Sequence, residues 1–170
     1  MENKSIDNLA GETALAICDD KVIDIGTMEN LATKALGVLQ EQGVYAMIVF
    51  LLSKTNNKPF DRLKKADEAR SAVFCIDKLN DCWEYSILNF LPKKENTKLS
   101  PLKLNIPKEA SKDDQKRLES EFREKLLKVK RTILDQYINL SNSLEELLFV
   151  KEFYEQTLIY VRHIAKGMKK

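Results

Sequence analysis

The sequence predicts an all-α protein, a compact bundle of about six helices that forms a single domain over residues 1–170. Glycine and proline are scarce, at five and four residues, which favours long helices over a fold with many turns. Apolar residues recur every three or four positions along most of the chain, the spacing of helices with one buried face. Residues 44–54 are apolar until Lys54 and too short for a membrane span, which needs about 20 residues, so they indicate a buried core helix.

Three helices are expected before residue 55. The first covers residues 5–17, where apolar side chains recur at helical spacing. Thr27 is a suitable N-cap for the second helix, and Gly43 is placed where a C′ glycine would end it. The third helix is the apolar run of residues 44–54, which we expect to be buried on all sides. Replacing Phe50 with alanine in that run should then cost about 3–5 kcal/mol.

A fourth helix and a long loop are expected next. Asp61 is a suitable cap for a helix that continues to Leu91 and stops at Pro92. Residues 92–112 then form a long polar loop, with isolated leucines that could lie against the body of the bundle. Limited proteolysis should cut this loop first, at its lysines Lys93, Lys94, Lys98 or Lys103.

Two helices complete the predicted bundle. Ser111 and Asp114 form a capping arrangement, and a narrow apolar stripe follows it: Leu118, Phe122, Leu126, Val129, Ile133, Tyr137 and Leu140. Ser143 and Glu146 fit the capping box that opens the last helix, which runs to Gly167.

The sequence offers few groups for catalysis, and we expect neither an enzyme nor a cofactor. His163 is the single histidine, and no glycine-rich phosphate-binding motif occurs. Cys18, Cys75 and Cys82 are odd in number and form no CxxC pair, which indicates a reducing cytoplasm. Cys75 and Cys82 are seven residues apart and share a helix face, so we expect them to pack in the core. The net charge of +2 and pI near 8.3 are too mild to indicate nucleic-acid binding by themselves.

The last helix carries a charged ridge opposite its apolar side. At 100° per residue, Lys151, Glu155, Arg162 and Lys166 fall within a sector of about 60°. Three cations on one ridge can align with the phosphates of a nucleic-acid backbone. The commoner explanation is a solvated face with an i,i+4 pair and favourable charges at a helix C-terminus. His163 lies at the edge of this sector, where an exposed histidine is the usual case.

Two segments together resemble the small subunit of type III-B CRISPR–Cas effector complexes, the Cmr small-subunit family. Residues 39–54 read LQEQGVYAMIVFLLSK. This segment is similar to a family pattern of a glycine, an apolar run, and then phenylalanine and leucines before a closing lysine. Residues 151–168 resemble the family's final helix, with a lysine–acid pair and then an aromatic residue, two basic positions and an alanine. This chain departs from the family at Tyr160, where tryptophan is expected, and at His163, the second basic position.

The resemblance implies a non-catalytic helical bundle that stacks with further copies of itself along a crRNA–target RNA duplex. Its partners would be the backbone and large subunits of the Cmr complex, with no membrane contact. Carried over by position, Lys54, Lys151, Arg162 and Lys166 are the expected nucleic-acid-binding residues. The alternative is a helical adaptor that binds only proteins, with the charged ridge serving solubility.

Overall fold

The structure is a computed structural model that describes residues 5–81, 97–107 and 109–169. Within these ranges the chain is all-helical, which confirms the predicted fold class. It contains α1 (Ile6–Ile17), α2 (Ile25–Lys54), the short 3-10 helix η1 (Phe60–Arg62), α3 (Glu68–Asp81), α4 (Lys112–Leu140) and α5 (Leu144–Met168).

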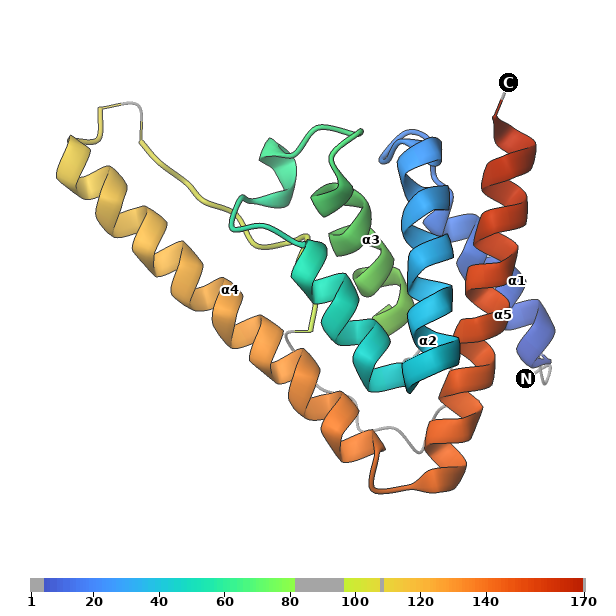
Figure 1. Cartoon of the computed structure of the whole chain (residues 1–170). Helices are drawn as coiled ribbons and strands as arrows, with labels where there is room; N and C mark the ends of the chain where they lie inside the picture. The colour runs from blue at the N-terminus through green and yellow to red at the C-terminus, as the bar shows by residue number, and fades with distance from the viewer. Residues whose placement is uncertain (1–4, 82–96, 108, 170) are drawn as a thin grey trace.

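The core lies where α5 packs along α1 and α2, and where α2 packs on α3 (Figure 1). Helix α4 runs along the side of the molecule opposite α1 and α5, and its N-terminal half projects away from the bundle. Large, fully buried side chains come from every α-helix and include Leu9, Ile17, Met28, Leu31, Leu39, Met47, Ile48, Leu51, Ile76, Leu79, Tyr137, Phe153 and Tyr154.

Helix α2 reverses direction at Gly43. This residue has φ +88° and ψ −176°, a conformation that is essentially restricted to glycine. The limb of residues 25–42 descends in Figure 1, and the limb of residues 44–54 ascends beside it. Glu68 on α3 contacts both Lys34 and Lys54, each at 3.6 Å, because the two limbs fold back on each other. The sequence predicted separate helices here, so its count of about six exceeds by one the five α-helices of the described residues.

The start of α2 also differs from the prediction. The helix begins at Ile25, and the N-cap is Asp24 rather than Thr27. The Asp24 carboxylate accepts hydrogen bonds from the Thr27 backbone N–H and hydroxyl, both at 2.8 Å. Thr27 was a reasonable candidate by residue type, but the acid three positions earlier satisfies the free N–H group.

The second limb of α2 is buried on one side only. Its core-facing residues are Val44, Met47, Ile48, Leu51 and Leu52. Tyr45 and Val49 are 39% and 42% exposed, and Phe50 is half-buried. The prediction of burial on all sides was therefore wrong, because this limb lies at the edge of the bundle and its outer face meets solvent.

Among the described helices, α2 is the one whose length and apolar composition would allow it to cross a membrane. The reversal at Gly43 divides it into two limbs, each shorter than the about 20 residues that a span needs. Many of its apolar side chains are buried in the bundle. The apolar composition of α2 is therefore explained by its packing in the core of the bundle.

Helix α3 begins at Glu68, seven residues later than the predicted cap at Asp61. Asp61 instead lies in the 3-10 turn η1. The Arg70 guanidinium fixes this turn, since it donates hydrogen bonds to the backbone carbonyls of Val22, Phe60 and Leu63 at 2.7–3.0 Å. The rest of the predicted helix, residues 82–91 with Cys82, lies outside the described residues, as does the start of the predicted loop.

Residues 97–107 contain no helix or strand and are fastened to α3 by Asp77. The Asp77 side chain is buried, and it accepts the backbone N–H groups of Leu99 at 2.7 Å and Ser100 at 2.8 Å. Burial raises the pKa of the Asp77 carboxyl, although these hydrogen bonds act to lower it. Leu99 is buried, and three partly buried residues alternate with exposed ones after it: Leu102, Leu104 and Ile106. The leucines therefore lie against the bundle, as the sequence suggested.

We expect Asp77→Ala to release this segment without unfolding the bundle. The change leaves two backbone N–H groups without their acceptor, at a cost of about 1–2 kcal/mol for the local structure. Trypsin should then cut at Lys98 and Lys103 about tenfold faster than in wild type, as measured by mass spectrometry of timed digests. Asp81→Asn is the matched control, because Asp81 lies on the same helix and pairs with the half-exposed Lys98 instead of holding backbone N–H groups of the segment. Equal cleavage of the two variants would contradict the role given to Asp77.

Helices α4 and α5 follow the predicted boundaries closely. Ser111 caps α4 by accepting the Asp114 N–H at 3.1 Å, and Ser143 caps α5 by accepting the Glu146 N–H at 3.4 Å. The predicted stripe of α4 is buried except for Leu118, which is half-buried. A buried hydroxyl pair joins the helices, with the Tyr137 and Tyr154 oxygens 2.7 Å apart.

Candidate nucleic-acid interface

The ridge predicted on α5 lies beside the first limb of α2. The apolar side of α5 is inserted between α1 and α2, which turns the charged residues outward. Arg162 and Lys166 are exposed and Lys151 is half-buried. Glu155, within the same ridge, accepts a hydrogen bond from Gln40 of α2 at 2.7 Å. The structure therefore keeps the three α5 cations on one side of the helix.

Two acids near the start of α2 face the C-terminal end of this ridge. Lys169 pairs with Glu29, and this hydrogen bond is the main cause that lowers the pKa of the Glu29 carboxyl. The positive charges of Lys169, Lys166 and Arg162 lower it further. Asp24 has a lowered pKa as well, chiefly through its bonds to Thr27 and to a smaller extent through Lys169. The ridge is therefore partly neutralised at one end.

Lys54 is not part of the same surface. It ends the second limb of α2, and in Figure 1 the first limb separates that end from α5. Its ammonium lies 3.6 Å from the Glu68 carboxylate and 5.4 Å from the centre of the Phe50 ring. These contacts leave its side chain 30% exposed. Of the four predicted residues, the structure brings together the three on α5 and leaves Lys54 beside α3.

His163 is exposed and lines an open groove between α1 and α5. The groove has a volume of about 440 Å³, and its wall includes Gly11 and the exposed Leu15. Across it, the Tyr160 hydroxyl donates a hydrogen bond to Asp7, which raises the pKa of the tyrosine. The α1 side of the groove contains the acids Asp7 and Glu12 and no cation, so it offers little to a phosphate.

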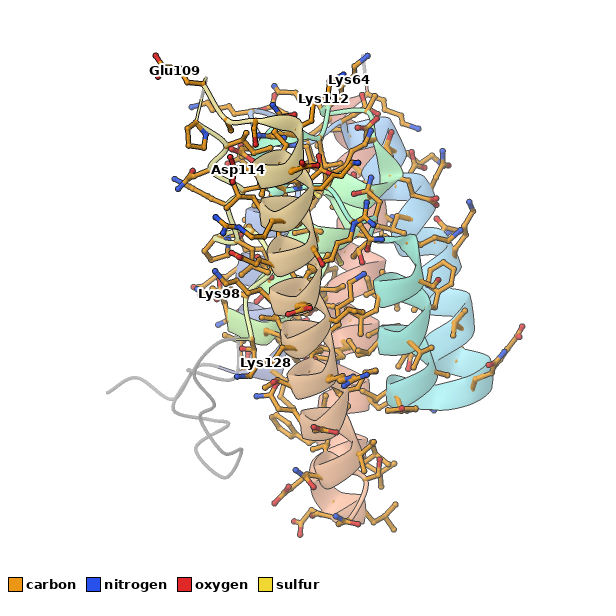
Figure 2. All side chains as sticks on the ribbon, turned by 90° about the vertical axis from the view of Figure 1, so that its left-hand side faces the viewer. Lys64, Lys98, Glu109, Lys112, Asp114 and Lys128 are labelled. Carbon is orange, nitrogen blue, oxygen red and sulfur yellow. The ribbon has the colours of Figure 1, made fainter. Side chains whose placement is uncertain are left out.

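A second basic surface, which the sequence analysis overlooked, lies on the middle of α4. Residues 123–131 contain a single acid, Glu124, and five cations: Arg123, Lys125, Lys128, Lys130 and Arg131. All but Lys130 are exposed, and burial lowers the pKa of the Lys130 ammonium. Figure 2 shows α4 from its outer side, with Lys128 on this stretch labelled. Counting charge over the whole helix hid this segment, because the first turns of α4 are rich in acids.

The two described cysteines are buried thiols. Burial raises the pKa of Cys18 to about 11 and that of Cys75 to about 12, so both are protonated at neutral pH. This confirms the prediction of core packing for Cys75, and Cys18 is buried in the core as well. Over the described ranges, no group of three or more His, Cys, Asp or Glu side chains could hold a metal ion.

Comparisons of the chain with protein-family models, with curated proteins and with solved structures found no match.

Proposed function

We propose that this protein is a non-catalytic small subunit of a type III-B CRISPR–Cas (Cmr) ribonucleoprotein effector complex, which acts in the cytoplasm in antiviral defence. Copies of it would stack along the crRNA–target RNA duplex, beside the backbone and large subunits. The α5 ridge of Lys151, Arg162 and Lys166 would contact the nucleic-acid backbone. Lys54 would make a separate contact, since it lies at the far end of α2.

The observation that carries this proposal is the exposure of Arg162 and Lys166 on the outward side of α5. The two segments that resemble the Cmr small-subunit family also support it. One spans the reversal of α2, the other forms most of α5, and these helices pack on each other. The basic middle of α4 adds a further exposed surface of the same charge.

The binding expected from this surface is weak and independent of RNA sequence. Lysine and arginine contacts to phosphates carry little sequence information, and each releases bound counterions. With three or four such contacts per copy, affinity should be modest and fall steeply as salt increases. Stacked copies that share one duplex would bind more tightly, because each later contact becomes intramolecular.

Charge reversal of the ridge tests the proposal. Lys151, Arg162 and Lys166 changed together to glutamate should leave helicity and melting nearly intact, because the two exposed residues and the half-buried lysine point away from the core. The reconstituted complex should then lose RNA at lower salt than wild type, as measured by RNA retained over a salt series. In the opposite direction, Glu29→Gln should increase retention, since Glu29 partly neutralises the ridge.

The matched control reverses three exposed lysines elsewhere: Lys21, Lys64 and Lys116. This control changes the net charge by the same amount without touching α5. Equal loss of RNA in both triple variants would show an effect of net charge alone and would count against the ridge.

A second candidate function is a helical adaptor that binds only proteins. Exposed apolar side chains favour it, at Tyr45 and Val49 on α2 and at Leu144 and Leu148 on α5. If the triple ridge variant retains as much RNA as the wild-type protein does over the whole salt series, the adaptor function is favoured. Co-purification with native partners, followed by a search for bound guide RNA, would separate the two functions directly.

A further inference from the structure

A cleft lies between the N-terminal half of α4, the turn η1 and the segment of residues 97–107. It has a volume of about 370 Å³, within the usual range for small-molecule sites. Its walls come from three separate parts of the chain, and all the lining residues belong to the described ranges. The cleft is on the side of the bundle away from α5 (Figure 1), so its occupancy does not depend on the proposed function.

The cleft combines an apolar floor with cationic walls. Pro59 and Phe122 are buried, and Leu104 is half-buried beside them. Lys58, Arg62 and Arg123 line the opening and are exposed, against a single acid, Glu119. The cleft therefore carries an excess of positive charge over a surface suited to a flat, apolar group.

The three cations have no ion-pair partner among the described residues. Arg62 donates a hydrogen bond to the Leu104 carbonyl at 3.3 Å, which holds its guanidinium at the wall of the cleft. In the part of the chain that the structure describes, no ion pair engages Lys58, Arg62 or Arg123. The nearby Arg117 on α4, in contrast, contacts Asp114 and Glu121. The two cleft arginines thus keep guanidinium donors available for an outside anion.

We propose that this cleft binds a nucleotide unit. Two arginines can hold a phosphate through paired hydrogen bonds, and the Lys58 ammonium adds a point charge. The apolar floor of Pro59, Leu104 and Phe122 receives the base. Asn57 and Glu119, also in the lining, supply polar groups for the base edge or the sugar hydroxyls. The nucleotide is either free in solution or the phosphorylated end of an RNA strand.

Calorimetric titration of the full-length protein tests this site, with adenosine 5′-monophosphate (AMP) as the probe. AMP should bind saturably, and adenosine and inorganic phosphate should each bind at least about tenfold more weakly, because each uses only half of the cleft. Arg123→Gln should weaken AMP binding by about tenfold or more, since it removes a charge-assisted hydrogen bond. The melting temperature of this variant should stay near that of wild type, because Arg123 is exposed.

Arg117→Gln is the matched control, an exposed arginine less than two turns before Arg123 on α4 and outside the cleft. It should bind AMP as wild type does. The proposal is overturned by absence of saturable AMP binding, by inorganic phosphate binding as tightly as AMP, or by equal effects of the two arginine variants.

Short RNA strands identify the source of the nucleotide. A tetranucleotide with a 5′-phosphate that binds more tightly than AMP, and more tightly than the same strand with a 5′-hydroxyl, assigns the cleft to an RNA end. AMP binding at least as tight as either strand assigns it to a free nucleotide. Arg123→Gln should weaken the preferred ligand in both cases.

Discussion

Replacing Phe153 with alanine should destabilise the protein by about 3–5 kcal/mol, the largest effect expected from a single substitution considered for this chain. Phe153 is fully buried on α5, and its ring centre lies 5.7 Å from that of Tyr154. The loss combines the transfer free energy of the ring with the cavity left between α5 and its neighbours. A protein with a typical stability of about 5–15 kcal/mol would then be near its limit.

Guanidinium titration followed by circular dichroism measures this effect, provided that the slope of the transition is unchanged. Phe153→Leu keeps most of the volume and should cost only about 1–1.5 kcal/mol, so it gives a readable result if the alanine variant fails to fold. Phe50→Ala is the comparison from α2, where a half-buried ring should cost clearly less. A larger loss at Phe50 than at Phe153 would refute the burial that the structure assigns to the two rings.

Replacing Gly43 with alanine should cost about 1–3 kcal/mol through backbone strain alone. Apart from the adjacent residues and nearby helix backbone, no heavy atom lies within 4 Å of the position that the new Cβ would occupy, so crowding by neighbouring elements does not contribute. The cost arises from φ +88° with ψ −176°, which a residue with a Cβ rarely adopts. Thermal or denaturant unfolding measures the loss.

Gly37 provides a control within the same helix. It has ordinary helical geometry and equally open space around its Cβ position, so Gly37→Ala should stabilise the protein by about 0.5–1 kcal/mol. The two substitutions are chemically identical and should act in opposite directions. Destabilisation of the same size at both positions would mean that Gly43 has no special conformation in solution.

The sequence predicted the helices well where local chemistry determines them. Ser111 and Ser143 cap their helices as expected, because a hydroxyl three residues before a free N–H is a local signal. The stripe from Phe122 to Leu140 also gave the buried face of α4, since helical spacing alone defines it. Gly43 was recognised as a break, although the sequence could not show that the chain folds back there.

The errors occurred where tertiary contacts decide the outcome. An apolar run has no polar face to orient it, so nothing in the sequence separates the exposed Val49 from the buried Ile48. The start of α3 depends on Arg70, which holds the nearby carbonyls of Phe60 and Leu63 and the distant carbonyl of Val22. Tertiary contacts also determine where the candidate site residues lie. Glu68 draws Lys54 away from α5, and Glu29 meets Lys169 across most of the length of the chain.

The packing of α5 has a consequence for synthesis on the ribosome. α5 contacts α1 and α2 more extensively than any other helix does, and residues as late as Ala165 are completely buried. The apolar faces of α1 and α2 are therefore translated long before the helix that covers them. Until α5 emerges, the nascent chain exposes surface that chaperones bind and that promotes aggregation. The bundle thus reaches its folded state after translation of its last helix, rather than helix by helix during it.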